Sequence, residues 1–325
     1  MKGLAVLRYH APALLDTAAR TYKSENARES SNGHLCALLD EAGYLKLSGR
    51  VSRCNAEYRA LRCSNGHSFK AIPTYRCNYR LCAFCARERQ RRTYARLSPV
   101  LEAYSKRNRF YRPILITLTV KSSHEPLRVQ DKWFKACFRK LRLSAKWKHH
   151  IAGAVAGFEF TYSPTEGWHY HVHILAFRKT VKHYRQEELL EQWTKITGGA
   201  GRGGVNIQSK GTLKSMTEEV LKYVTKPTNL RSWGAEQVFQ FNQLKRVKLS
   251  ECYGELRGLK LDEDEEAQAD AVRAAAVASD PHAGLEEGSP CPCCAEPLRY
   301  QLVSRALLSA VSNSPPSRRN NERQT

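Results

Sequence analysis

His169-Tyr170-His171-Val172-His173 has the pattern of a segment inside a β-strand. Because successive strand residues point to opposite faces, the three imidazoles would project from one side and the other two side chains from the opposite side. The flanking residues 168 and 174–177 are aromatic or aliphatic, which also favours a strand. Two imidazoles two residues apart on a rigid strand can chelate one cation, and the third could orient a ligand or a substrate. The alternative is a half-buried strand whose histidines only form hydrogen bonds.

The segments around this strand alternate between strand and helix patterns. Runs of β-branched and aliphatic residues predict strands over residues 113–120, 151–162 and 205–208. Apolar residues at helical spacing predict helices over residues 129–143, 185–196 and 213–225, the last of which is stopped by Pro227. The turn at residues 163–167 makes the histidine strand the second arm of a hairpin, and residues 198–204 form a glycine-rich loop. The order β-α-β-β-α-β-α predicts an α+β fold, an antiparallel sheet with split βαβ connections and one final helix near the sheet.

The chain is strongly basic. Its 325 residues include 53 Lys and Arg against 31 Asp and Glu, a formal net charge of +22. Nine acids and one base fall within residues 261–288, so the rest of the chain carries 52 bases against 22 acids. This excess suits a polyanion such as nucleic acid, although a basic structural protein of the ribosomal kind would also show it. No stretch approaches the ~18 apolar residues of a membrane span, so we expect a cytoplasmic protein without a membrane partner.

Cysteines between residues 54 and 85 have the spacing of a zinc site. The pattern Cys77-x4-Cys82-x2-Cys85 lets the thiolates of a tight turn face one tetrahedral ion. In a reducing compartment, eleven cysteines are more often metal ligands or free thiols than a disulfide framework. We predict a zinc ion bound by Cys63, Cys77, Cys82 and Cys85, with Cys54 and His67 as reserve ligands. Free buried thiols are the alternative.

Five arginines follow this block at a spacing that would cover a helix with positive charge. They are Arg87, Arg89, Arg91, Arg92 and Arg96. A basic helix beside a zinc knuckle indicates a surface that contacts phosphates, and the alternative is a solvated basic helix.

A second cysteine motif, Cys291-Pro292-Cys293-Cys294, could form half of another zinc knuckle. No cysteine follows it in the sequence. Cys252 is the only nearby candidate partner, so this site could be shared, intermolecular or absent.

The predicted helix at 213–225 carries a further set of polar residues. Glu219 and Tyr223 are four residues apart and Tyr223 and Lys226 three apart, which places all three on one helical face. A carboxylate, a phenol and an amine beside a metal-binding strand suit phosphoryl transfer. A free phenol ionises near pH 10, so it needs a neighbouring cation or base to attack at neutral pH. Without the histidine strand, the same trio would be an ordinary amphipathic surface.

Taken together, residues 54 to 260 resemble the HUH endonucleases, and most closely the single-tyrosine replication initiators of rolling-circle plasmids. The family's Leu-Thr-Leu-Thr strand is matched by residues 116–119, and its His-Pro-His-hydrophobic-His motif by residues 169–173. Its Glu-x3-Tyr-x2-Lys motif is matched by Glu219, Tyr223 and Lys226, and a cysteine cluster precedes the nuclease in many members. Two positions depart from the pattern: Tyr170 replaces a proline, and Ala83 stands where a Cys-Pro-x-Cys knuckle would have one.

The resemblance implies a set of site residues. His171 and His173 would hold a divalent cation, Mg²⁺ or Mn²⁺, against the scissile phosphate. Glu159, on the strand expected to pair with the histidine strand, is the candidate third ligand, and a purely structural role for it is the alternative. Tyr223 would attack phosphorus and leave a 3′ hydroxyl and a 5′ phosphotyrosine. Lys226 would stabilise the charge, and Glu219 would activate water or assist the second transfer at termination.

The implied function is initiation of plasmid rolling-circle replication. The expected partners are plasmid origin DNA, single-stranded at the nick site, and a host helicase and polymerase. An HUH transposase or relaxase is less favoured, because only Tyr223 lies in the motif helix and no helicase-type P-loop is present. A non-catalytic zinc-dependent nucleic-acid-binding protein would explain the charge and the cysteines, but not the aligned histidines.

The sequence divides into five predicted segments. Residues 1–50 have no assigned role, 51–98 form a Cys- and Arg-rich zinc module, and 99–260 form the endonuclease domain. Residues 261–289 are an acidic linker, helical or disordered, and 290–325 carry the Cys-Pro-Cys-Cys motif and a tail that is expected to be disordered from residue 313.

Overall fold

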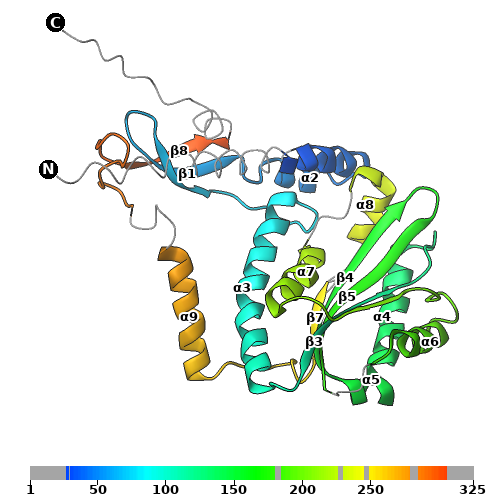
Figure 1. The fold of residues 1–325 in the computed structure, drawn as a ribbon. Helices are drawn as coiled ribbons and strands as arrows, with labels where there is room; N and C mark the ends of the chain where they lie inside the picture. Colours follow the sequence, from blue (N-terminus) through cyan, green and yellow to red (C-terminus); the bar gives the residue numbers. More distant parts are fainter. Residues whose placement is uncertain are drawn as a thin grey trace, which may run out of the picture.

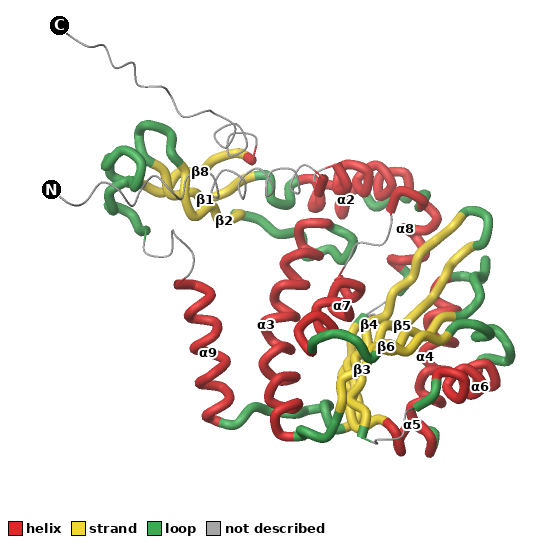
Figure 2. The backbone as a smooth tube through the Cα atoms, viewed as in Figure 1, coloured by secondary structure: helices red, strands yellow, loops and turns green. Residues whose placement is uncertain are grey.

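The structure, a computed structural model, describes residues 27–28, 30–179, 184–225, 230–244, 249–278 and 285–305. These residues build two separate sheets, one of five strands and one of three, with helices around and between them (Figures 1 and 2). No helix in the described ranges is long and apolar enough to cross a membrane. The tail predicted from residue 313 lies outside the described residues.

The five-stranded sheet has the histidine strand at its centre. Its strands are β3 (Arg112–Thr119), β4 (Ile151–Ser163), β5 (Gly167–Arg178), β6 (Val205–Gln208) and β7 (Ser250–Gly254). They lie in the order β6-β3-β5-β4-β7, and all neighbours are antiparallel. Because β5 lies between β3 and β4, the predicted split βαβ arrangement and antiparallel sheet are confirmed. The edge strand β7 is an addition that the sequence analysis did not identify.

One face of this sheet is covered by four helices. They are α4 (Leu127–Leu143), α5 (Ala145–His150), α6 (Gln186–Ile196) and α8 (Ala235–Asn242). Helix α4 buries one side because Phe134, Phe138 and Leu141 recur at spacings of three and four residues. These side chains pack in one core with Tyr170 and Val172 of β5.

The opposite face, which carries the histidines, is partly covered by α3 (Ala83–Arg107) and α7 (Leu213–Thr225) (Figure 1). Leu97 and Leu101 of α3 and Val220 of α7 pack with Leu175 and Phe177 of β5. Leu175 and Phe177 have the same parity along β5 as the histidines, so they lie on the same face. The 25-residue α3 also crosses the predicted domain boundary at residue 98 without interruption.

The three-stranded sheet joins strands that are far apart in the sequence. It consists of β1 (Glu57–Arg62), β2 (Ser68–Pro73) and β8 (Arg299–Ser304), with β1 in the middle (Figure 2). A helical segment at 30–41 and α2 (Leu45–Ser52) precede β1. Residues 51–98 and 290–325 were predicted to form different segments. They share this sheet because β8 pairs with β1 along its whole length, a long-range contact that sequence periodicity does not encode.

The acidic segment is helical over α9 (Glu263–Ala278), one of the two alternatives that the sequence left open. This helix follows η1 (Leu230–Ser232), α8 and β7 in the chain and lies alongside α3 (Figure 1). Arg107 at the end of α3 forms ion pairs with Asp262 and Glu265 at the start of α9. The acidic helix therefore connects the five-stranded sheet to the segment that returns to β1.

Candidate active site and metal centres

β5 presents its three histidines on one face, as the alternation predicted. Tyr170 and Val172 are fully buried on the opposite face, whereas His169, His171 and His173 are only half-buried. The histidine side chains therefore line a surface that a ligand can reach.

The strands on either side of β5 add polar groups to this face. Glu159 of β4 is directly opposite His171, and its Oε2 lies 2.6 Å from His171 Nε2 and 3.4 Å from His173 Nε2. On the other side, Thr119 of β3 pairs with His171 and Thr117 with His173. Thr117 Oγ1 lies 3.2 Å from His173 Nδ1, a hydrogen bond that fixes the orientation of this ring.

The structure thus brings together the three residues predicted as ligands of a divalent cation. One donor atom from each of Glu159, His171 and His173 lies within 4.8 Å of the others. The carboxylate oxygen suits Mn²⁺ and Mg²⁺, the imidazole nitrogens are common metal ligands, and Mg²⁺ needs few protein ligands because it keeps several waters. The donor set therefore fits the cation and leaves coordination positions for water or phosphate oxygens.

The charge state of Glu159 also suits cation binding. Burial alone would raise its pKa, but hydrogen bonds from His171 and His173 and their electrostatic attraction lower the pKa to about 2. The carboxylate is therefore ionised at any physiological pH. His169 stands beside this group, with its ring centroid 5.2 Å from that of His171, and burial together with the His171 charge lowers its pKa.

Tyr170 anchors the histidine strand from the opposite face. Its hydroxyl donates a hydrogen bond to Asp131 Oδ1 of α4, and its ring lies 4.6 Å, between centroids, from that of Phe134. Asp131 also pairs with Lys135 at 2.7 Å. The tyrosine that departs from the HUH motif is thus part of the core under the candidate metal site.

We expect Tyr170→Phe to reduce stability without changing the metal site. The ring would still pack, but the buried hydrogen bond to Asp131 would be lost, at a cost of about 1–3 kcal/mol in free energy of unfolding. Urea denaturation measures this loss, and Mn²⁺ affinity of the folded variant should match that of the wild type. Unchanged stability would show that the Tyr170 hydroxyl does not contribute to the core.

The predicted Glu-Tyr-Lys set falls at the end of α7. Glu219 is half-buried, and Tyr223 follows one turn later in the same helix. The side chain of Tyr223 and the whole of Lys226 lie outside the described part of the chain. Helix α7 packs through Val220 and Leu221 on the sheet face that carries the histidines.

Helix α7 follows the edge strand β6 and precedes, along the chain, the segment that packs at the start of β5. β6, which precedes α7, ends where Gln208 pairs with Leu115, near the middle of β3 and beyond the histidine pairs. After α7 the chain returns at Trp233, whose ring centroid is 5.1 Å from that of Trp168 at the start of β5. Tyr223 belongs to the last turn of α7, between these two points along the chain.

Four buried cysteines gather where α3 begins. Sulfur–sulfur distances are 3.5 Å for Cys54–Cys85, 3.6 Å for Cys77–Cys85 and 3.6 Å for Cys54–Cys82. Zn–S bonds of about 2.3 Å in a tetrahedron place two sulfurs about 3.8 Å apart, so these four thiols fit one zinc ion. Hydrogen bonds from Cys54 and Cys77 lower the pKa of Cys82, which favours the thiolate that zinc binds.

This group corrects the predicted ligand set, because Cys54 takes the place of Cys63. Cys54 precedes β1 and Cys63 follows it, and a six-residue strand is about 20 Å long. The two cysteines therefore cannot share one ion. Cys63 and His67 lie instead at the β1–β2 turn, beside Cys291 and Cys294.

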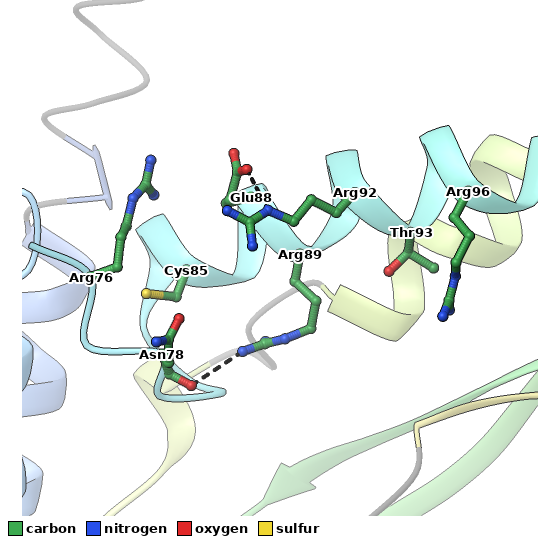
Figure 3. Close-up of a pocket in the computed structure, with 8 residues that line it drawn as sticks. All are labelled: Arg76, Asn78, Cys85, Glu88, Arg89, Arg92, Thr93 and Arg96. Atoms are coloured by element: carbon green, nitrogen blue, oxygen red, sulfur yellow. Dashed lines mark hydrogen bonds and ion pairs between the residues drawn. The ribbon is translucent and has the colours of Figure 1, made fainter. Parts of the chain in front are cut away.

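The predicted arginines of α3 line two neighbouring pockets next to the Cys54 group. Arg89, Arg92 and Arg96 line one pocket (Figure 3), and Arg87 and Arg91 line the other. Arg76, which the sequence analysis did not single out, contributes to both pockets because it stands in the loop before α3. Glu88 pairs with Arg91 and Arg92 at 3.2 and 2.8 Å and partly offsets their charge. The remaining positive charge suits phosphate groups.

A further pocket opens at the end of β3, lined by Thr119, Lys121, Arg202 and the glycine-rich loop. Thr119 pairs with His171, so this pocket begins next to the candidate metal site. A Cβ at Gly204 would lie 2.4 Å from the Thr119 carbonyl oxygen, so the loop can approach the strand only with glycine there. The sequence predicted the loop but gave no role to Lys121 or Arg202, because isolated bases in a loop carry no periodic signal.

Comparisons with known proteins agree with these features. A family model described as "Replication protein" matches residues 69–283. The chain is 28% identical over 178 residues to a "Protein rep" of Lactiplantibacillus plantarum, covering 50% of this chain and 56% of that protein. It is 24% identical over 222 residues to a "Protein rep" of Lentilactobacillus hilgardii, covering 62% and 70%. No solved structure matches the chain.

Proposed function

Because this chain belongs to the Replication protein family, we propose that it initiates rolling-circle replication of a plasmid by nicking and rejoining one strand of the origin. One observation carries the proposal. Glu159, His171 and His173 converge on the face of the sheet against which α7, the helix of Tyr223, packs. A cation-binding group and a tyrosine approaching from a neighbouring helix are the two parts that such a nuclease needs.

In this proposal Glu159, His171 and His173 hold Mg²⁺ or Mn²⁺ beside the scissile phosphate. The bound cation would neutralise charge on the phosphate oxygens and favour one orientation of the group. Thr117 would keep the His173 ring in place through its 3.2 Å hydrogen bond. Tyr170 would hold β5 itself through Asp131 on the far side of the sheet.

Tyr223 would act as the nucleophile. Its Oη would form a bond to phosphorus in line with the P–O3′ bond, which breaks, and its phenolic proton would pass to a neighbouring base or water. The products are a 3′ hydroxyl that can prime a polymerase and a 5′ phosphate linked to the tyrosine. Lys226, three residues later, would stabilise phenolate or phosphate charge.

Glu219 would act in termination. Once Tyr223 is bound to DNA, a second cut needs another nucleophile, and a half-buried carboxylate one turn earlier in α7 could activate a water. Initiation would then use tyrosine and termination would use water.

We expect Glu219→Ala to nick and form the tyrosine adduct but to release fewer unit-length circles. The ratio of monomer circles to longer products in a replication assay measures the effect. Glu218→Ala is the matched control, because Glu218 is an exposed acid one position earlier in the same helix. A ratio equal to that of the control would show that the Glu219 carboxylate has no part in termination.

The arginine-lined pockets along α3 and the pocket of Lys121 and Arg202 are the surfaces we propose for DNA. Contacts from these bases to phosphates would make binding strongly dependent on salt and largely independent of sequence. The strand at the nick site would be single-stranded, and a host helicase and polymerase would extend the primer.

The proposed function is tested by incubating the purified chain with Mn²⁺ and DNA of the replicon that carries its gene. The expected product is a supercoiled plasmid nicked on one strand at one position, with a 3′ end that a polymerase extends. A non-catalytic zinc-dependent DNA-binding protein would retard the plasmid on a gel but leave it supercoiled. That result would overturn the proposal.

A further inference from the structure

The β1–β2 turn and the loop before β8 meet at a second group of metal-binding side chains. Cys63 and His67 come from the turn between β1 and β2, and Cys291 and Cys294 from the loop before β8. We propose that these four residues bind a second zinc ion, which clips the C-terminal segment onto the β1–β2 hairpin.

The distances fit one tetrahedral ion. Cys63 Sγ lies 3.3 Å from His67 Nδ1 and 3.6 Å from Cys294 Sγ, and Cys291 Sγ lies 3.6 Å from His67 Nδ1. All four donor atoms are within 4.8 Å of one another. A Zn–S bond of about 2.3 Å and a Zn–N bond of about 2.0 Å place neighbouring ligand atoms about 3.5–3.8 Å apart. The sulfurs of a disulfide are about 2.05 Å apart, so the 3.6 Å between Cys63 and Cys294 is too long for one. The three thiols and the imidazole surround one common point instead.

Each pair of ligands is presented by a tight turn. In the first turn, the Gly66 N–H donates to the Cys63 carbonyl at 3.1 Å, and Gly66 has the positive φ of 84° that this bend requires. In the second turn, the Cys294 and Ala295 N–H groups donate to the Cys291 carbonyl at 3.3 and 2.8 Å. Two short loops with paired ligands facing each other form the arrangement of a structural Cys₃His zinc site.

The strand pairing brings the two turns together. Arg62 at the end of β1 pairs with Arg299 at the start of β8, so the loops that contain the ligands leave the sheet at the same edge. The partner that completes the Cys-Pro-Cys-Cys motif is therefore the β1–β2 turn, not Cys252, which lies on β7 of the other sheet.

The surroundings of this site show why a metal ion would be needed. The buried apolar cluster under the turns consists of Leu61, Cys63, Phe69, Cys291 and Leu298. A second small cluster of the same sheet consists of Tyr58, Ala60 and Val303. Small modules with so few buried apolar residues commonly depend on a metal ion. The ion would also join residues more than 200 positions apart, since Cys63 and Cys294 are separated by 231.

The proposal predicts the zinc content of the full-length chain. Native mass spectrometry and metal analysis should find two zinc ions in the wild type and one in the double variant Cys291→Ser, Cys294→Ser. Cys293→Ser should keep two, because Cys293 is exposed and outside the group. The double variant Cys54→Ser, Cys82→Ser should lose only the other ion. Equal zinc content in the wild type and the Cys291/Cys294 variant would overturn the proposal.

A second measurement covers the case in which the Cys291/Cys294 variant fails to fold and loses both ions. His67→Cys replaces the imidazole by a thiol, which is also a possible metal ligand. When the folded variant is loaded with Co²⁺, either the changed ligand set should alter the visible absorption or one of the two ions should be lost. An unchanged spectrum with two ions would exclude His67 as a ligand and contradict the proposed site. Neither measurement depends on DNA cleavage. A negative result for the second zinc site would therefore leave the proposed replication function untouched.

Discussion

Tyr223→Phe should abolish both DNA nicking and the covalent protein–DNA adduct. The substitution keeps the ring and removes only the hydroxyl that would attack phosphorus. Removal of a catalytic nucleophile lowers the rate by at least about 10⁴-fold. The thermal midpoint should change little, because the fold does not lose an apolar group. Nicking of radiolabelled single-stranded DNA in Mn²⁺ and a denaturing gel measure both effects.

Two other tyrosines serve to check this assignment. The Tyr170 hydroxyl is buried and bonded to Asp131, and the Tyr253 hydroxyl donates to Glu251 at 2.7 Å. Burial raises the pKa of both phenols, which further disfavours attack by either. Tyr253→Phe should therefore still form the adduct. An adduct that persists in Tyr223→Phe would mean that the nucleophile lies elsewhere.

The double substitution His171→Ala, His173→Ala should remove cleavage that depends on a divalent cation. It leaves Glu159 as the one remaining residue of the three predicted ligands, and the loss of several kcal/mol of charge stabilisation lowers the rate by about 10³-fold or more. Affinity for DNA should remain close to wild type, since it depends mainly on Lys and Arg contacts to phosphates. Cleavage rates with added Mn²⁺ and salt-dependent binding measure the two properties separately.

His149→Ala is the matched control for this pair. It also removes an imidazole, but from the exposed surface of α5, on the far side of the sheet. Cleavage by the control should equal that of the wild type. If the His171/His173 double variant also cleaves at that rate, the candidate metal site is wrong.

Much of the five-stranded sheet could be predicted because its signals are local. The alternation of residues 169–173 predicted which side of β5 carries the histidines, and the hairpin turn predicted β4 as its neighbour. Glu159 could be proposed from this pairing together with the family resemblance, and the register places it directly opposite His171. β7 was not predicted because it is a five-residue edge strand. Its first four residues are partly buried and the last is exposed, so it has no clear alternation of buried and exposed positions.

The zinc ligands show where local signals end. The spacing of Cys77, Cys82 and Cys85 identified them as zinc ligands. The sequence offers six candidate ligands before residue 86, and their spacing does not show which of them belong to which of two sites. The division depends on β1, which separates Cys54 from Cys63. Recognising residues 57–62 as a strand would have excluded Cys63 from the first group. No periodic signal could have shown that Cys63 meets Cys291, because that contact follows from the pairing of β1 with β8.

The most direct test of the central claim is to identify the residue that carries the DNA. The wild-type chain is incubated with Mn²⁺ and single-stranded oligonucleotides that tile the replicon, the adduct is digested with nuclease and protease, and the peptides are sequenced by mass spectrometry. We expect a 5′-phosphate nucleotide remnant on the phenolic oxygen of Tyr223. A remnant on any other residue, or cleavage without a covalent peptide, would contradict it.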